Sequence, residues 1–139
     1  GTENLYGIVG FAKALELATA NYEADSSHIG TLKYYMMDEL KKNIKGVAFN
    51  GDPLGRSLYT VLSVSFPKTE KSEMILFNLD INNICASGGS ACTSGADQGS
   101  HVIRAINNNP NQVTVRFSFS KHNTRAEVDA VVEKLKELM

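Results

Sequence analysis

The chain has 139 residues, of which 42% are hydrophobic and 21% are charged, so its length and composition predict one globular domain. Fourteen basic and fifteen acidic residues give a net charge of −1, which argues against nucleic acid or an anionic membrane as a primary partner. No apolar run approaches the ~20 residues of a membrane span, and no signal peptide is visible. Two cysteines seven residues apart are typical of reduced thiols in the cytoplasm rather than of a disulfide framework.

The first third of the chain predicts helical structure. Apolar residues recur with the helical period over residues 5–18, with Thr2 or Asn4 as the N-cap, and again over residues 29–44, where Gly46 ends the pattern. The two patterns could form two helices or one long bent helix. Their apolar stripes are predicted to lie in the core.

The middle of the chain alternates between short strands and a short helix. Residues 47–49 and 58–66 are rich in strand-forming side chains and are separated by turn residues. Residues 71–79 predict a helix in which residues 74–77 are largely buried. Residues 82–86 predict a further short strand.

The last third holds the clearest patterns. Residues 100–106 predict one or two helical turns, and residues 113–120 alternate between apolar and polar side chains, as a strand with one buried face does. Thr124-Arg125-Ala126-Glu127 is a capping box that opens a helix. Together these elements predict an α+β fold, a small mixed sheet covered by helices.

A loop of small residues connects the middle to the last third. Residues 85–95 read Cys-Ala-Ser-Gly-Gly-Ser-Ala-Cys-Thr-Ser-Gly, and three glycines raise the entropic cost of ordering them, so residues 87–99 are predicted to be mobile. Cys92 is either a nucleophile or an inert small residue, and the residues alone leave both open. Cys85 is predicted to be a buried structural thiol. Cys85, Cys92 and His101 match no standard zinc spacing, so no metal site is predicted.

Three motifs resemble one enzyme family. Residues 87–95 resemble the active-site cysteine loop of the cysteine desulfurases, pyridoxal-phosphate enzymes of the class V aminotransferase family that take sulfur from L-cysteine, chiefly for iron–sulfur cluster assembly. Residues 1–4, Gly-Thr-Glu-Asn, resemble the segment shortly after the cofactor lysine. Residues 115–118, Val-Arg-Phe-Ser, resemble the strand that carries the substrate-binding arginine. The motifs occur in the family's order over essentially the whole chain.

The resemblance implies a role for three residues. Cys92 would take the sulfur of L-cysteine as a persulfide and pass it to an acceptor or iron–sulfur scaffold protein. Arg116 would bind the substrate carboxylate, because a guanidinium can hold a carboxylate through two parallel hydrogen bonds; the alternative is a solvated arginine on the outer face of a strand. Thr2 would reach the cofactor phosphate of the neighbouring subunit in a homodimer; the alternative is a plain N-cap.

One departure from the family bears on activity. The Ser-x-His-Lys motif that holds the cofactor is absent. The resemblance therefore implies the C-terminal part of a desulfurase, with residues 1–25 as a linking helix and residues 26–139 as the small domain of a fold-type I pyridoxal-phosphate enzyme. Such a part would lack the cofactor-lysine domain, bind no pyridoxal phosphate and be inactive alone. The alternatives are a stand-alone sulfur-carrier or redox module and a non-catalytic interaction domain.

Overall fold

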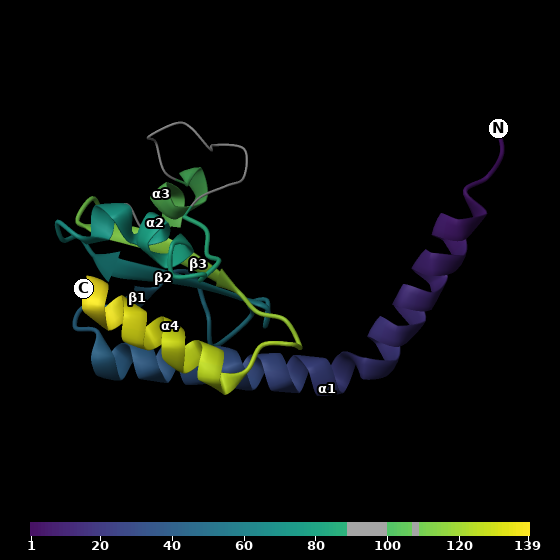
Figure 1. Cartoon of the computed structure of the whole chain (residues 1–139), viewed down its shortest axis with the longest axis horizontal. Coiled ribbons are helices and arrows are strands. Elements are labelled where there is room, and N and C mark those ends of the chain that lie inside the picture. The colour runs from purple at the N-terminus through teal and green to yellow at the C-terminus, as the bar shows by residue number, and fades with distance from the viewer. Residues whose placement is uncertain (89–99, 107–108) are drawn as a thin grey trace.

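A computed structural model of the chain describes residues 1–88, 100–106 and 109–139. The chain forms helices and short strands in the order α1 (Leu5–Asn43), β1 (Ala48–Phe49), β2 (Val61–Pro67), the 3-10 helix η1 (Ser72–Met74), α2 (Ile75–Asp80), α3 (His101–Ile106), β3 (Gln112–Ser118) and α4 (Arg125–Leu138) (Figure 1). The predicted α+β class is confirmed. The predicted mobility of residues 87–99 falls almost entirely outside the described residues.

The sheet has three strands in the order β1-β2-β3. All strand pairs in the described part of the chain are antiparallel, whereas the sequence predicted a mixed sheet. In the longer pair, Val64 lies opposite Val115 and Ser63 lies opposite Arg116. The alternation predicted for β3 is confirmed, since Val115 and Phe117 are buried and Arg116 is exposed.

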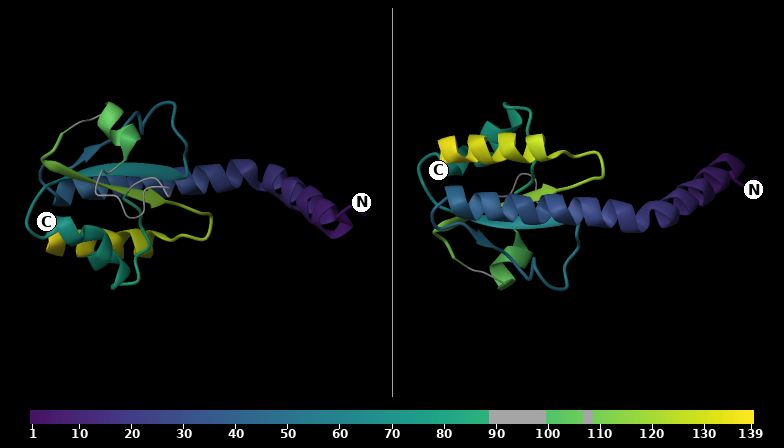
Figure 2. Two further views of the ribbon diagram at one scale, coloured as in Figure 1. Left: turned by 90° about the horizontal axis from the view of Figure 1, so that it is seen from above. Right: turned by 90° about the horizontal axis from the view of Figure 1, so that it is seen from below.

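The core lies between one face of this sheet and two helices. The C-terminal half of α1 and the whole of α4 lie side by side along the sheet (Figure 2). The fully buried apolar side chains come from α1, α4, the sheet and α2: Met36, Leu40, Leu62, Val64, Phe66, Leu79, Val115 and Leu135. The capping box at α4 is confirmed, because the Thr124 hydroxyl accepts from the Glu127 backbone N–H and the Glu127 carboxylate accepts from the Thr124 backbone N–H.

The first helical region is one continuous helix, the second of the two predicted forms. The Asn4 side chain caps α1 by accepting from the Gly7 backbone N–H, so Asn4 rather than Thr2 is the N-cap. The helix bends part-way along, and its N-terminal part projects away from the rest of the molecule (Figure 1). Residues 1–24 are all exposed, and the first buried residue of α1 is Ile29.

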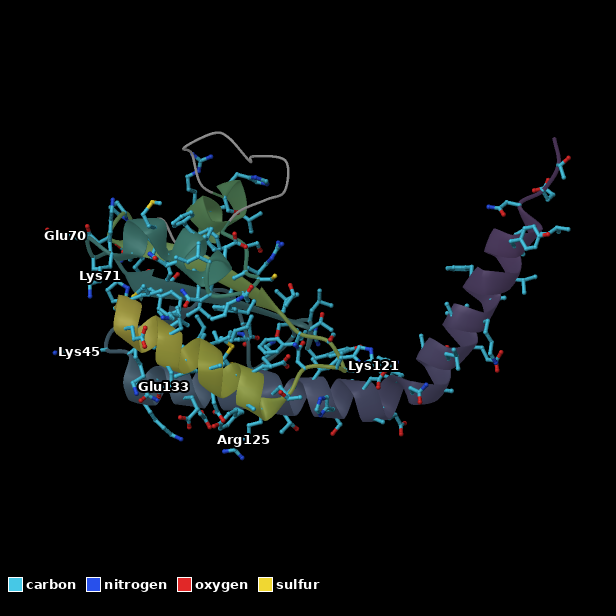
Figure 3. The ribbon with its side chains drawn as sticks, in the orientation of Figure 1. Lys45, Glu70, Lys71, Lys121, Arg125 and Glu133 are labelled. Atoms are coloured by element: carbon cyan, nitrogen blue, oxygen red, sulfur yellow. The ribbon has the colours of Figure 1, made fainter. Side chains whose placement is uncertain are left out.

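The prediction that the apolar stripe of residues 5–18 lies in the core was therefore wrong. Its side chains stand clear of the sheet and the other helices (Figure 3). Leu5, Ile8, Val9 and Leu15 are each more than half exposed. The helical period of these residues is real, but no other described element of the chain covers the face that it forms.

Two predictions for the middle of the chain were also wrong in part. The predicted helix over residues 71–79 exists as η1 and α2, but only Ile75 and Leu79 are buried, and Met74 and Phe77 are exposed. A helix of this length presents only one face to the core. Residues 82–86 form no strand, because Asn83 has a positive φ of 60°, which breaks the extended conformation.

Candidate functional site

The three predicted site residues lie in three different parts of the chain. Arg116 lies on β3, in the body of the molecule. Thr2 lies before α1, at the exposed end of the projecting part and far from β3 (Figure 1). Cys92 lies outside the described residues. Within the described chain, Arg116 and Thr2 are therefore not brought together.

The alternation of β3 determines where Arg116 points. Val115 and Phe117 are directed into the core, so the neighbouring residues Thr114 and Arg116 stand on the opposite face of the sheet. The connection before β2 and the helix α3 approach the sheet on that face. The guanidinium is thus presented on the side of the sheet that α1 and α4 leave uncovered.

Arg116 is also paired with the residue that begins the cysteine-containing segment. The Ser87 backbone N–H donates to the Arg116 carbonyl oxygen at 3.1 Å, and the Arg116 backbone N–H donates to the Ser87 carbonyl oxygen at 2.6 Å. The two residues form an isolated antiparallel bridge. This bridge holds the N-terminal end of the segment containing Cys92 directly against the strand of Arg116.

A cavity of about 260 Å³ lies beside Arg116, between the sheet and α3. Its sheet side is polar, and its helix side is aliphatic, formed by Val102, Ile103 and Ile106. Gly88 also lines it, and a Cβ at this position would come too close to the Leu76 side chain. Glycine at position 88 therefore lets the backbone lie against α2 at the edge of the cavity.

The polar side of this cavity includes residues that the sequence did not single out. The Asn50 side chain donates to the Ser63 hydroxyl at 3.1 Å and accepts from the Ser65 hydroxyl at 3.0 Å. The Ser65 hydroxyl is also 3.2 Å from the Thr114 hydroxyl. One signal was available in the sequence. Ser63 and Ser65 alternate with apolar residues in a strand that is otherwise rich in apolar residues.

Comparison with known proteins places the chain in a family. The profile of the family "Aminotransferase class-V" matches residues 1–131. The chain belongs to this family. A cysteine desulfurase of Nostoc sp. is 36% identical over the whole of this chain, and a cysteine desulfurase of Klebsiella pneumoniae is 39% identical over 97% of it.

Solved structures give the same fold. A NifS-like protein from Rickettsia africae superimposes with a TM-score of 0.75 at 26% identity, over 99% of this chain and 35% of its own. A second NifS-like protein gives a TM-score of 0.76 at 30% identity, over 99% of this chain and 34% of its own. The chain likewise spans 35% of the length of the Nostoc relative and 34% of that from Klebsiella.

Members of this family generally use pyridoxal phosphate, which requires a lysine amine, so the lysines of this chain are informative. Lys33 is the one lysine of the described residues that is buried, with 2% of its surface exposed. Its amine donates to the Ser57 hydroxyl and to the Leu58 carbonyl oxygen, each at 2.9 Å, and burial lowers its pKa. Lys33 thus fixes the chain before β2, and no lysine lines the Arg116 cavity.

Cys85 is not the buried thiol that the sequence predicted. Ile84 and Ala86 are partly buried against the core, so Cys85 between them turns outward and is exposed. It borders a second cavity, of about 440 Å³, between α4 and the segment before Ser87.

Among the described residues, no three His, Cys, Asp or Glu side chains gather as a metal site. In that part of the chain, no helix has both the length and the apolar character to cross a bilayer.

Proposed function

We propose that this chain is part of a cysteine desulfurase, in which Arg116 binds the carboxylate of L-cysteine and Cys92 accepts its sulfur. Relatives with that name align over 97% or more of the chain and support the assignment. The observation that carries it is the backbone pairing of Arg116 with Ser87. This pairing joins the strand of the proposed carboxylate-binding residue to the segment of the proposed sulfur acceptor.

Arg116 has the chemistry that an amino-acid substrate requires. A guanidinium presents parallel N–H donors in a planar fork that matches a carboxylate. The small side chains around it, including Ser63 across the strand pair, leave space for a ligand. A cavity of about 260 Å³ is large enough for a molecule the size of cysteine.

Cys92 is close enough along the chain to act on such a substrate. It is the fifth residue after Ser87, and five residues span at most about 18 Å when fully extended. The thiolate is the reactive form of cysteine and is a minor species at neutral pH for an ordinary thiol. In the proposed reaction, an S–S bond forms at Cys92 as the C–S bond of L-cysteine breaks, and a proton completes L-alanine.

The remaining parts of the proposal concern the whole enzyme. Residues 1–25 would be a linking helix whose exposed apolar face is covered by another part of the enzyme, and residues 26–139 would be the small domain. Pyridoxal phosphate would be held by a lysine elsewhere in the polypeptide, with Thr2 reaching the cofactor phosphate across a homodimer. The persulfide would pass to an acceptor or iron–sulfur scaffold protein in the cytoplasm.

The proposed sulfur acceptor is tested by substitution in the longer enzyme that contains this chain. Cys92→Ser removes the soft nucleophile, so alanine formation and protein persulfide should both fall by orders of magnitude, while L-cysteine still binds. Cys85→Ser is the matched control and should keep both activities. Normal persulfide formation by Cys92→Ser would rule out this role for Cys92.

The proposed carboxylate site is tested in the same enzyme. Arg116→Ala removes a hydrogen-bonded charge pair worth about 1.5–3 kcal/mol, so the affinity for L-cysteine should fall roughly ten- to hundredfold. Arg116→Lys should restore only part of it, since a lysine cannot make the bidentate contact. Arg104→Ala, on α3 and away from the cavity lining, is the control. Unchanged binding by Arg116→Ala would contradict the assignment.

The encoded residues that precede Gly1 separate this proposal from its alternatives. A Ser-x-His-Lys motif there would support a desulfurase. A complete reading frame without that motif, together with a persulfide on Cys92, would instead support a sulfur-carrier module. If neither the motif nor a persulfide were found, the result would support a non-catalytic interaction domain.

A further inference from the structure

The polar side chains beside Arg116 form a hydrogen-bonded network. The Ser65 hydroxyl donates its one hydrogen to the Asn50 side-chain oxygen. Since that hydrogen is used, Thr114 must be the donor in the contact between the Thr114 and Ser65 hydroxyls. The Asn50 side-chain nitrogen donates to the Ser63 hydroxyl oxygen at 3.1 Å and, at 3.5 Å, to the Thr114 hydroxyl oxygen.

This donor accounting leaves one hydrogen over. Ser63 accepts from Asn50, so its own hydroxyl hydrogen is not needed for that contact. Among the described residues, the Ser63 hydroxyl makes no side-chain hydrogen bond besides this one. Hydrogen-bonded hydroxyl and amide groups polarise one another, which strengthens a donor attached to the network. Ser63 is attached to the network of Thr114, Ser65 and Asn50 through Asn50, and its hydroxyl hydrogen is the donor that remains.

Ser63 lies directly beside the guanidinium-bearing residue. The two are register partners in the β2–β3 pair. The Ser63 carbonyl oxygen accepts from the Asn50 backbone N–H, and the Arg116 backbone N–H and carbonyl oxygen both hydrogen-bond to Ser87. The backbones of Ser63 and Arg116 therefore do not hydrogen-bond to each other. They form the closer kind of antiparallel pair, with Cα atoms about 4.5 Å apart. Both residues line the 260 Å³ cavity.

We propose that Ser63 donates a second hydrogen bond to the substrate carboxylate at Arg116, and that Asn50 is the positioning residue that directs the Ser63 hydrogen toward the cavity. The inference rests on the proposed function and adds a residue to its binding site. A carboxylate offers about four lone-pair sites on two oxygens, and a bidentate arginine uses two of them. A hydroxyl from the neighbouring strand can satisfy another.

The aliphatic side of the cavity strengthens this arrangement. Val102 and Ile103 of α3 line the other side of the cavity, and their side chains offer no hydrogen bond that would compete for the carboxylate. A hydrogen bond to a charged group is stronger than one between neutral groups. The site would thus favour a small molecule with a free carboxylate over one without it.

The experiment uses the longer enzyme and measures binding by calorimetry with two probes. 3-Mercaptopropionate keeps the carboxylate and thiol of cysteine without the amine, and cysteamine keeps the amine and thiol without the carboxylate. Ser63→Ala should weaken 3-mercaptopropionate about tenfold or more and leave cysteamine unchanged. Ser63→Thr, which restores the hydroxyl, should recover most of the affinity. Ser118→Ala, on the same strand pair but outside this cavity, should match the unsubstituted enzyme.

The positioning role of Asn50 is tested by a double-mutant cycle. Asn50→Ala should weaken 3-mercaptopropionate by a smaller factor than Ser63→Ala, because the hydroxyl remains but loses its orientation. The double variant should bind no more weakly than Ser63→Ala alone, since both changes remove the same contact. Additive losses would contradict an action of Asn50 through Ser63.

The outcomes separate this inference from the proposed function. Equal weakening of both probes by Ser63→Ala would show a purely structural role and overturn the inference, as would normal binding of 3-mercaptopropionate. If Arg116→Ala still weakened the carboxylate probe, the proposed function would stand without Ser63. If the unsubstituted enzyme bound neither probe nor L-cysteine, the proposed function itself would fail.

Discussion

The two halves of α1 share an apolar period but lie in opposite environments. The C-terminal half buries Met36, Leu40 and their neighbours against the sheet and α4. The N-terminal half presents Leu5, Ile8 and Leu15 on a face that no described element covers. The helical period thus indicates an apolar helix face that another element can cover, but it does not indicate whether that element lies in the same chain.

The difference also separates two sources of helix stability. The buried half is held by tertiary contacts, which supply most of the stability of helices in proteins. The projecting half depends on local interactions, such as the Asn4 cap and the ion pair of Lys13 with Glu16 at 2.8 Å. We therefore expect the two halves of one helix to respond differently to equivalent changes.

The largest expected difference is in matched leucine truncations. Leu40→Ala creates a cavity at a side chain with 0% exposure and should lower the free energy of unfolding by about 2–5 kcal/mol. Leu15→Ala, at a side chain with 58% exposure, should change it by less than about 0.5 kcal/mol. Urea unfolding of the 139-residue chain measures both. A large loss from Leu15→Ala would mean that the projecting face is covered in solution.

A smaller difference is expected between the two helix caps. Thr124→Ala removes the capping box of α4 and should cost about 0.5–2 kcal/mol of global stability. Asn4→Ala removes the same kind of contact from α1, but only the projecting half should fray, because local opening there need not involve the body.

Global unfolding and amide exchange separate these two effects. Asn4→Ala should leave the urea midpoint unchanged while it speeds exchange at Gly7, whose backbone N–H the Asn4 side chain accepts. An equal shift of the midpoint by both cap variants would mean that the projecting half and the body unfold as one unit.

Local patterns were sufficient for the elements whose signals are contained in a few residues. The cap at Thr124 and the alternation around Val115 both follow from neighbours in the sequence, and both are confirmed. Residues 82–86 show the limit of such patterns, because the left-handed Asn83 overrides a run that reads as a strand. The positive φ of this one residue interrupts the extended backbone that a strand would need.

The composition of the candidate site could be predicted only in part. Arg116 followed from a motif that resembles a family, whereas Ser63 and Asn50 join it through sheet register, which a single sequence does not specify. Register depends on contacts between segments far apart in the chain. The role predicted for Cys92 stays a prediction, and the structure does not describe that residue.

A further difference between the two caps is their response to acid. The Thr124 backbone N–H, and then the Asn123 side chain, hold the pKa of Glu127 below its usual value. A carboxylate with a lowered pKa binds fewer protons in the folded than in the unfolded state, so its stabilisation is present above the usual glutamate pKa and is lost as the pH falls through the folded value. The Asn4 cap has no such group.

This sign is tested by urea unfolding of the unsubstituted chain and Glu127→Gln from about pH 6 to about pH 3. The unsubstituted chain should be the more stable at the upper end, and the difference should shrink toward the lower end. A difference that stays constant with pH would contradict an ionised Glu127 as the source of the stabilisation.

The smallest expected effect lies where the two halves of α1 meet. The connection between β3 and α4 approaches the helix there (Figure 3), and the Lys121 amine lies 3.5 Å from the Asp25 carboxylate. Both groups are partly exposed, so Asp25→Asn should cost less than about 1 kcal/mol, and less still in high salt. Glu16→Gln breaks the shorter contact with Lys13, yet it should not change global stability, because both partners lie in the projecting half. A larger loss from Glu16→Gln than from Asp25→Asn would show that this half is held by contacts beyond those within its own helix.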